Sequence, residues 1–301
     1  MFKKIGLVSC LLMFGLAAAS FAGSFEQIDR VTGFFVSQMP GPGGSPEVVT
    51  TNIVPDDMII DRAGNGYASF LSHVNKVNKY NASTRDLVWS QTLNSPSDLS
   101  FDNSGGLWVR SSDGINKINA SNGSIVEAYG YDAVGGSRGV RFACDPTNNY
   151  FYSFDDVQNV LKSYTYSNGF SENAAFTLTA TPGAQAIYGP IINFAVMNSL
   201  VVVLNPDGLN FITTGAAFTG PVRYAGSFMG LALDGRGNVF TYDRIARKLL
   251  KLNYTIGQVR VVSELPFSDG ISAIAIGRQQ TLVCAASGAS TIDLVTFRQT
   301  Q

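Results

Sequence analysis

Beyond about residue 55, the chain alternates short apolar runs with polar turns. The apolar runs are rich in β-branched and aromatic residues, and Gly, Asn and Asp interrupt them about every 8–12 residues. Such runs favour strands, because branched and aromatic side chains fit a pleated surface. No stretch after the N-terminus has the period of an amphipathic helix. The pattern therefore predicts an antiparallel all-β protein.

The same pattern recurs along the chain. Residues 55–64 match residues 96–105, and residues 77–83 recur as residues 115–121, in the same order. Two ordered matches at similar offsets indicate a repeated structural unit. Each unit contains an apolar segment, a polar turn, a second apolar segment, an Asn- and Lys-rich segment and a more variable one. The unit therefore predicts four short strands.

Six such units can be counted, and their first strands begin near residues 57, 98, 141, 193, 230 and 273. Repeats of four strands at this length are typical of a β-propeller. Two stacked sandwiches are the less favoured alternative. The last unit lacks a fourth strand, and we expect residues 30–38 to supply it, because this closes the ring and removes an exposed edge. Residues 40–46, rich in Pro and Gly, then link this strand to the first blade.

The first 22 residues have the features of a secretory signal peptide. Lys3 and Lys4 precede an apolar stretch over residues 5–19, and Ser20-Phe21-Ala22 then forms an A-x-A-like cleavage site. We expect cleavage after Ala22, a secreted or periplasmic protein, and one propeller domain over residues 23–301. A lipoprotein signal ending at Cys10 is the less favoured alternative, because its apolar stretch is short. No later stretch is long enough to span a membrane.

Composition narrows the function classes. The net charge is −1 and there is no long basic run, which argues against an electrostatic nucleic-acid binder. Once Cys10 is removed with the signal, Cys144 and Cys284 remain. They fall in opposite blades of a six-bladed ring, too far apart for a disulfide. We expect both to be free, buried and unreactive, and the protein to be a monomer.

Residues 96–109, with the core Asp-Asn-Ser-Gly-Gly-Leu-Trp-Val, resemble NHL-repeat propellers and the related virginiamycin B lyase and gluconolactonase-like families. Residues 234–240 show the same likeness. The lyase resemblance implies a metal with His and Glu residues late in the ring. Here the one histidine, His73, belongs to blade one, and Glu264 is the only late glutamate. This departure from the family pattern argues against lyase activity.

The gluconolactonase-like resemblance implies a divalent metal at the channel mouth, held by acidic and Asn side chains where first strands begin. In this sequence Asp57, Asp98 and Asn193 stand in that column and could bind Ca²⁺, which prefers oxygen ligands. Arg141 shares the column, and Gly230 and Ala273 complete it. The favoured interpretation is that Arg141 pairs with Asp98 in a wet channel. The metal site is the alternative.

Further acids are expected in loops on the same face. Asp155 and Asp243 are candidate ligand-binding residues there, beside Asp113, Asp156, Asp207 and Asp269. Acids are also ordinary turn residues, so a solvated face is the simpler interpretation.

We expect a non-catalytic module that binds an unknown small molecule, glycan or protein through its channel mouth. The alternative is a Ca²⁺-dependent lactonase-, esterase- or lyase-like enzyme that uses the metal to polarise a carbonyl. A third alternative is a surface propeller that adheres through its sides.

Overall fold

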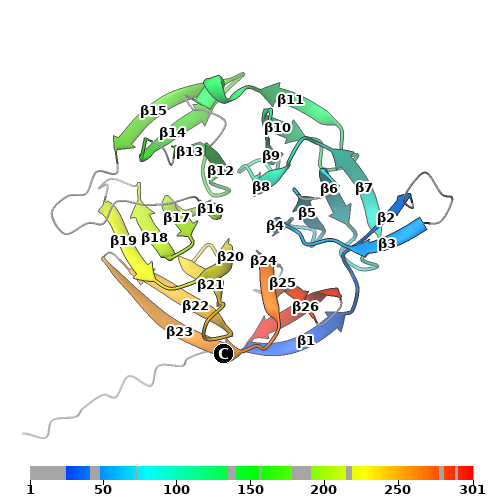
Figure 1. Cartoon of the computed structure of the whole chain (residues 1–301). Helices are drawn as coiled ribbons and strands as arrows, with labels where there is room; N and C mark the ends of the chain where they lie inside the picture. The colour runs from blue at the N-terminus through cyan, green and yellow to red at the C-terminus, as the bar shows by residue number, and fades with distance from the viewer. Residues whose placement is uncertain are drawn as a thin grey trace, which may run out of the picture.

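Six four-stranded antiparallel sheets stand around a central axis in the computed structural model (Figure 1). The structure describes residues 25–40, 48–71, 74–134, 140–155, 158–177, 191–214, 219–255, 257–277, 281–288 and 291–300. Within each sheet the first strand lies innermost, and the first strands of neighbouring sheets contact one another around the axis. The all-β six-bladed propeller predicted from the repeats is confirmed.

The strands of the first three blades follow directly along the chain. Blade one contains β4 (Asp57–Ile60), β5 (Gly66–Phe70), β6 (Lys76–Tyr80) and β7 (Leu87–Thr92). Blade two contains β8 (Ser97–Phe101), β9 (Leu107–Ser111), β10 (Gly114–Ile118) and β11 (Ile125–Tyr129), followed by the short 3₁₀ helix η2 (Tyr131–Val134). Blade three contains β12 (Arg141–Cys144), β13 (Tyr150–Asp155), β14 (Val160–Tyr166) and β15 (Phe170–Thr177).

The last three blades continue around the ring. Blade four contains β16 (Asn193–Met197), β17 (Leu200–Asn205), β18 (Gly208–Thr213) and β19 (Thr219–Ala225). Blade five contains β20 (Phe228–Leu233), β21 (Asn238–Asp243), β22 (Lys248–Thr255) and β23 (Gln258–Pro266). Blade six contains β24 (Gly270–Ile276), β25 (Leu282–Ser287) and β26 (Ile292–Gln299), and its outer strand comes from the N-terminus.

That outer strand is β1 (Phe25–Val31), which pairs antiparallel with β26 from Phe25↔Gln299 to Val31↔Leu294. The predicted closure by an N-terminal strand is confirmed, but the strand lies earlier than residues 30–38. The reason is Gly33, whose left-handed φ of 63° turns the chain away from the sheet. Its N–H donates to Asp293 Oδ1 at 2.9 Å, which fixes the turn.

The segment after the turn forms a separate hairpin. Strand β2 (Val36–Pro40) pairs with β3 (Val48–Asn52), so residues 36–38 do not belong to blade six. The base of the hairpin is held by Phe35, whose N–H donates to the Ile292 carbonyl, and by Ile53, whose N–H donates to the Phe35 carbonyl. Most of the predicted linker over residues 40–46 lies outside the described residues.

An aspartate ends the first strand of several blades and organises the next turn. Asp102 Oδ1 accepts hydrogen bonds from the N–H groups of Ser104 and Gly106. Gly105 in this turn has a φ of 85°, a conformation that disfavours side chains. Asp61 and Asp234 accept equivalent bonds in blades one and five. The polar turn therefore recurs in the sequence because in each of these blades an aspartate side chain binds the backbone N–H groups of the turn.

The repeated lysines also have a structural role. Lys79, Lys117 and Lys251 each lie over an aromatic ring on the second strand of their own blade, with Nζ 5.3–5.8 Å from the ring centroid. Lys117 Nζ also lies 5.1 Å from the ring centroid of Tyr166 in blade three. Lys79 Nζ also donates to the Ala120 carbonyl in blade two at 2.7 Å, and Lys251 Nζ to Gln299 in blade six at 2.7 Å. These lysines therefore join neighbouring blades.

Candidate functional site

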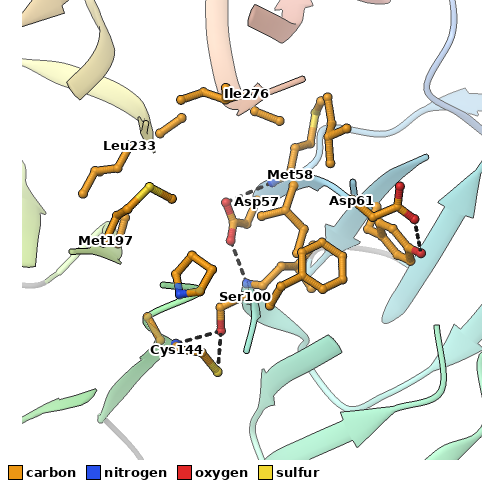
Figure 2. A pocket seen from close by; sticks show the side chains of 18 of the residues that line it. Asp57, Met58, Asp61, Ser100, Cys144, Met197, Leu233 and Ile276 are labelled. Carbon is orange, nitrogen blue, oxygen red and sulfur yellow. Dashed lines mark hydrogen bonds between the residues drawn. The ribbon is translucent and has the colours of Figure 1, made fainter. Parts of the chain in front are cut away.

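The first strands of the blades enclose a central cavity of about 720 Å³. Figure 2 shows it from close by, with Asp57, Met197, Leu233 and Ile276 on different sides. Apolar side chains make up much of the wall: Met58, Ile60, Leu99, Phe101, Ala143, Ala195, Met197, Leu233, Ile274 and Ile276. The cavity extends from Asp57 and Asn193, where the strands begin, to the turns in which they end, which contain Ala63, Gly105 and Gly235.

Asp57 begins β4 and is buried at one end of this cavity. Its Oδ1 accepts a hydrogen bond from Met58 N–H at 2.9 Å, and its Oδ2 accepts one from Leu99 N–H in blade two at 2.7 Å. Burial raises the pKa of Asp57 to about 7, and the nearby Asp98 charge adds to the rise, while hydrogen bonds from Leu99, Met58 and Asn193 oppose it. This carboxyl is therefore partly protonated near neutral pH.

Asn193 begins β16 in blade four and reaches the same place. Its Nδ2 donates to Asp57 Oδ1 at 3.4 Å across the end of the cavity. Its Oδ1 accepts a hydrogen bond from Phe194 N–H at 2.6 Å, as Asp57 does from Met58. The structure therefore brings together two of the predicted site residues that lie far apart in the sequence.

Asp98 and Arg141 form a second pair. Arg141 Nη1 donates to Asp98 Oδ1 at 2.8 Å, while Nη2 donates to the Ile191 carbonyl. Arg110 Nε lies 4.0 Å from Asp98 Oδ2, so a second guanidinium balances this buried carboxylate. The predicted pairing of Arg141 with Asp98 is thus present. Separating Arg141 from Asp98 would leave a buried charge without a partner, and this cost keeps the two side chains together.

The loop acids are placed differently. Asp155 is buried and accepts a hydrogen bond from Gln158 N–H, and Asp243 accepts bonds from the N–H groups of Ile245 and Ala246. Asp207 pairs with Arg223, Asp269 with Arg30, and Asp113 accepts a bond from Asn94. These acids serve turns and ion pairs, and neither Asp155 nor Asp243 lines the central cavity. His73 and Asp156 lie outside the described residues.

Calcium binding by Asp57, Asp98 and Asn193 stays a prediction. Both Asp57 oxygens accept backbone N–H groups, and Asp98 is engaged by Arg141, so an ion would have to replace bonds already made. Within the described ranges, no three or more His, Cys, Asp or Glu side chains gather in a way that could hold a metal. An oxygen-rich site would need backbone carbonyls or water as well.

The sequence comparison of first-strand starts did not identify the apolar wall. Met58, Phe101, Met197 and Leu233 lie one to four residues beyond the compared positions 57, 98, 193 and 230, on strands that were already located. Ser100 and Cys144 also line the cavity, joined by a hydrogen bond from Ser100 Oγ to Cys144 Sγ at 3.3 Å. Continuing the comparison along each first strand is the signal that would have found them.

The raised pKa of Asp57 predicts a stability that depends on pH. The pKa of Asp57 is about 7 in the folded state and about 3.8 in the unfolded chain, so between these values the folded state binds the proton more tightly. The contribution of Asp57 is therefore complete at low pH and is lost as pH rises. We expect the free energy of unfolding to fall between pH 5 and pH 7, by at most about 1.4 kcal/mol per pH unit. Asp61, Glu127 and Asp293 have lowered pKa values and titrate below this window.

Urea unfolding at pH 5, 6 and 7 measures this slope. Asp57→Asn is expected to flatten it whatever its effect on absolute stability, while Asp207→Asn, at an exposed ion pair, should leave it unchanged. A residual slope of the same sign is expected from Asp56, because partial desolvation raises its pKa too. An equal slope in wild type and Asp57→Asn would contradict the prediction.

Both cysteines in the described part of the chain are free and buried. Burial raises the pKa of the Cys144 thiol and of the Cys284 thiol, so neither forms a thiolate readily. This agrees with the expectation that they are unreactive. No helix among the described residues has the length and apolar character needed to cross a bilayer.

Comparison with known proteins places the fold but not the activity. No family model matches the chain, and no curated protein is significantly similar in sequence. A chain of the mitotic checkpoint complex is similar in structure at 13% identity and a TM-score of 0.57, over 93% of this chain and 86% of that one. U3-55K is similar at 9% identity and a TM-score of 0.53, over 88% and 98% of the two chains.

Selenomethionine-substituted virginiamycin B lyase from Staphylococcus aureus is similar at 13% identity and a TM-score of 0.54, over 92% of this chain and 94% of that one. Identities this low support a shared fold and nothing finer. Together with six four-stranded blades closed by an N-terminal strand, these likenesses confirm the predicted resemblance to β-propeller proteins at the level of the fold.

Proposed function

We propose that this protein is a non-catalytic binding module and that its central cavity takes a small, mainly apolar molecule. The observation that carries this is the wall of the cavity. Its volume of about 720 Å³ lies within the range of small-molecule sites, about 300–1,000 Å³. Apolar side chains cover much of the wall, and Asp57 and Asn193 supply polar atoms at one end. At the other end, Asp61, Asp102 and Asp234 also line the cavity, and each accepts hydrogen bonds within its own turn. Such a site favours an apolar body with one hydrogen-bonding group.

The reactive side chains in the wall support binding rather than chemistry. Ser100 Oγ donates to Cys144 Sγ and accepts from Cys144 N–H at 3.1 Å, so it faces no general base in these contacts. The pKa of Cys144 is raised by burial, which disfavours the nucleophilic thiolate. Two methionines in the wall, Met58 and Met197, add adaptable surface of the kind that suits an apolar ligand.

The structural neighbours are compatible with this proposal without deciding it. One is a lyase and another belongs to a protein complex, so the same fold is used for catalysis and for assembly. A protein partner on the channel face is therefore the second kind of binding to test. A wall that is apolar deep inside the ring favours a small molecule, because a protein surface does not reach there.

We also propose that the protein acts outside the cytoplasm, after export. The support is the N-terminal sequence, in which Lys3 and Lys4 precede the apolar residues 5–19. Cleavage after Ala22 leaves β1 intact, because that strand begins at Phe25. The mass of the protein recovered from the periplasm or the medium tests this. A chain that keeps residues 1–22 and stays in the cytoplasm would overturn it.

Titration with the neutral fluorescent probe N-phenyl-1-naphthylamine tests the binding proposal. We expect its fluorescence to rise as it leaves water for the cavity. Met197→Trp narrows the cavity and should weaken binding by at least about tenfold, which corresponds to about 1.4 kcal/mol. Ile245→Trp introduces the same residue at a position 82% exposed and should leave binding unchanged. Equal binding by all three proteins would place the probe elsewhere and contradict the proposal.

The metal alternative is tested on the same samples. A stoichiometric bound ion, with a melting temperature that falls on adding chelator, would favour the Ca²⁺-dependent enzyme and a role for Asp57, Asp98 and Asn193 as ligands. An unchanged melting temperature with Ca²⁺ and with chelator supports the binding module.

A further inference from the structure

The interface between blades six and one differs from the others where the ring closes. In blades two and five, counting five residues from the aspartate that caps the turn reaches Leu107 and Val239, both fully buried against the preceding blade. The same count from Asp61 reaches Gly66 in blade one. Gly66 shares the strand face of Ala68 and Phe70, which pack toward blade six. Blade one therefore lacks a large side chain at this place.

Blade six does not fill the space from its own side. Its residues in this interface include Ala273, Ala275 and Ala285, all buried and small. Elsewhere aromatic rings from the blades occupy the interfaces, such as Trp108 with Phe151 at 5.2 Å between blades two and three. Here Phe34 and Phe35, from the segment after β1, join Phe70 and Tyr80 of blade one.

A cavity of about 360 Å³ remains, which we call the seam pocket. One side is aromatic: the rings of Phe34 and Tyr80 lie with centroids 5.0 Å apart and tilted by 50°. Val283 and Leu294 of blade six add apolar lining. A Cβ added to Gly66, which lines the pocket, meets no atom within 4 Å. The space is therefore open at the glycine.

An apolar ring bound against Phe34 and Tyr80 would remove apolar surface from contact with water. The pocket also has polar lining residues, among them Asn81, Ser83 and Thr281. Its volume falls within the range of small-molecule sites. The one arginine in its described lining, Arg85, already pairs with Asp29. A charged ligand would therefore compete with an existing ion pair, whereas an uncharged ring gains contacts with Phe34 and Tyr80.

We propose that the seam pocket is a second binding site, separate from the central cavity, and that it takes a compact uncharged aromatic ring system about the size of indole. Met58, Ile60 and Tyr67 line both cavities and form the partition between them. Gly66 lines the seam pocket alone, whereas Met197 lines the central cavity alone. The two sites can therefore be altered one at a time.

Indole is the probe for this site, and the melting temperature measured by calorimetry is the readout. At about ten times its dissociation constant, indole should raise the melting temperature of the wild type by about 2–4 °C. Gly66→Leu fills the pocket and should abolish that shift. Without indole, this variant should melt at or above the wild-type temperature, because the side chain enters free space in a strand. Gly66→Ala leaves most of the volume and should retain the shift.

Met197→Trp separates this proposal from the proposed function. It should weaken N-phenyl-1-naphthylamine binding and leave the indole shift intact, while Gly66→Leu should do the reverse. An indole shift that persists in Gly66→Leu would overturn the seam site. So would a Gly66→Leu variant that melts well below Gly66→Ala, because the space would then not exist. A failure of the naphthylamine result alone leaves the seam site standing.

Discussion

Replacing Trp108 by alanine is expected to lower the free energy of unfolding by about 3–5 kcal/mol. Trp108 lies in β9 with no exposed surface, at the interface of blades two and three. Its ring contacts Tyr166 at 5.1 Å and Phe170 at 5.6 Å between centroids. Its Nε1 donates to Asp102 Oδ2 at 2.9 Å, so the substitution also removes a donor from the carboxylate that caps the turn between β8 and β9.

Trp89→Ala is the matched control, because Trp89 is the other tryptophan of the chain. It lies half-buried on the outer strand β7, and its Nε1 donates to the Ala120 carbonyl at 3.1 Å. Equilibrium unfolding in urea, followed by circular dichroism, should show a clearly smaller loss for Trp89→Ala. Similar losses for both variants would mean that the interface of blades two and three contributes no more to stability than the outer strand β7.

A chain that begins at residue 32 is expected to lose cooperative folding or to aggregate. It lacks β1, so β26 presents an unpaired edge to solvent. It also lacks Arg30, whose Nε donates to Asp293 at 2.8 Å and whose Nη2 pairs with Asp269. Asp293 is almost fully buried. Losing Arg30 leaves this carboxylate without its cation, which adds to the loss of the strand.

The control for this deletion is a chain that begins at residue 23, which keeps β1 and Arg30. It should elute as a compact species in size-exclusion chromatography and melt in one transition. Arg30→Ala isolates the ion pair from the strand and should give an intermediate melting temperature. A chain from residue 32 that melts like the longer chain would show that the ring does not need its closing strand.

The repeats allowed much of the fold to be predicted from sequence. Asp61, Asp102 and Asp234 recur because each caps the same turn, and Lys79 and Lys117 recur because each lies over a ring of the second strand. Closure by the N-terminus followed from a missing strand. Its position did not, because Phe34, Phe35 and Val36 continue an apolar run beyond Gly33. Only the turn at Gly33 shows that they leave the sheet.

The candidate site was predictable in part. The order of the repeats placed Asp57, Asp98, Arg141 and Asn193 in one column, and the contacts of Asp57 with Asn193 and of Asp98 with Arg141 follow from that. The raised pKa of Asp57 depends on burial by several blades, which no local pattern contains. The seam pocket depends on small residues of blade six facing Gly66 across the ring closure, and this juxtaposition exists only in three dimensions.

The pairing of β1 with β26 has a mechanical consequence. Phe25 pairs with Gln299, so both ends of the chain leave blade six at the same end of one antiparallel ladder. A force applied between these ends opens the ladder one hydrogen bond at a time, as a zipper opens, instead of shearing all of its bonds together. The closing strand can therefore contribute to thermal stability, while a low force applied between the termini is still expected to open the ring.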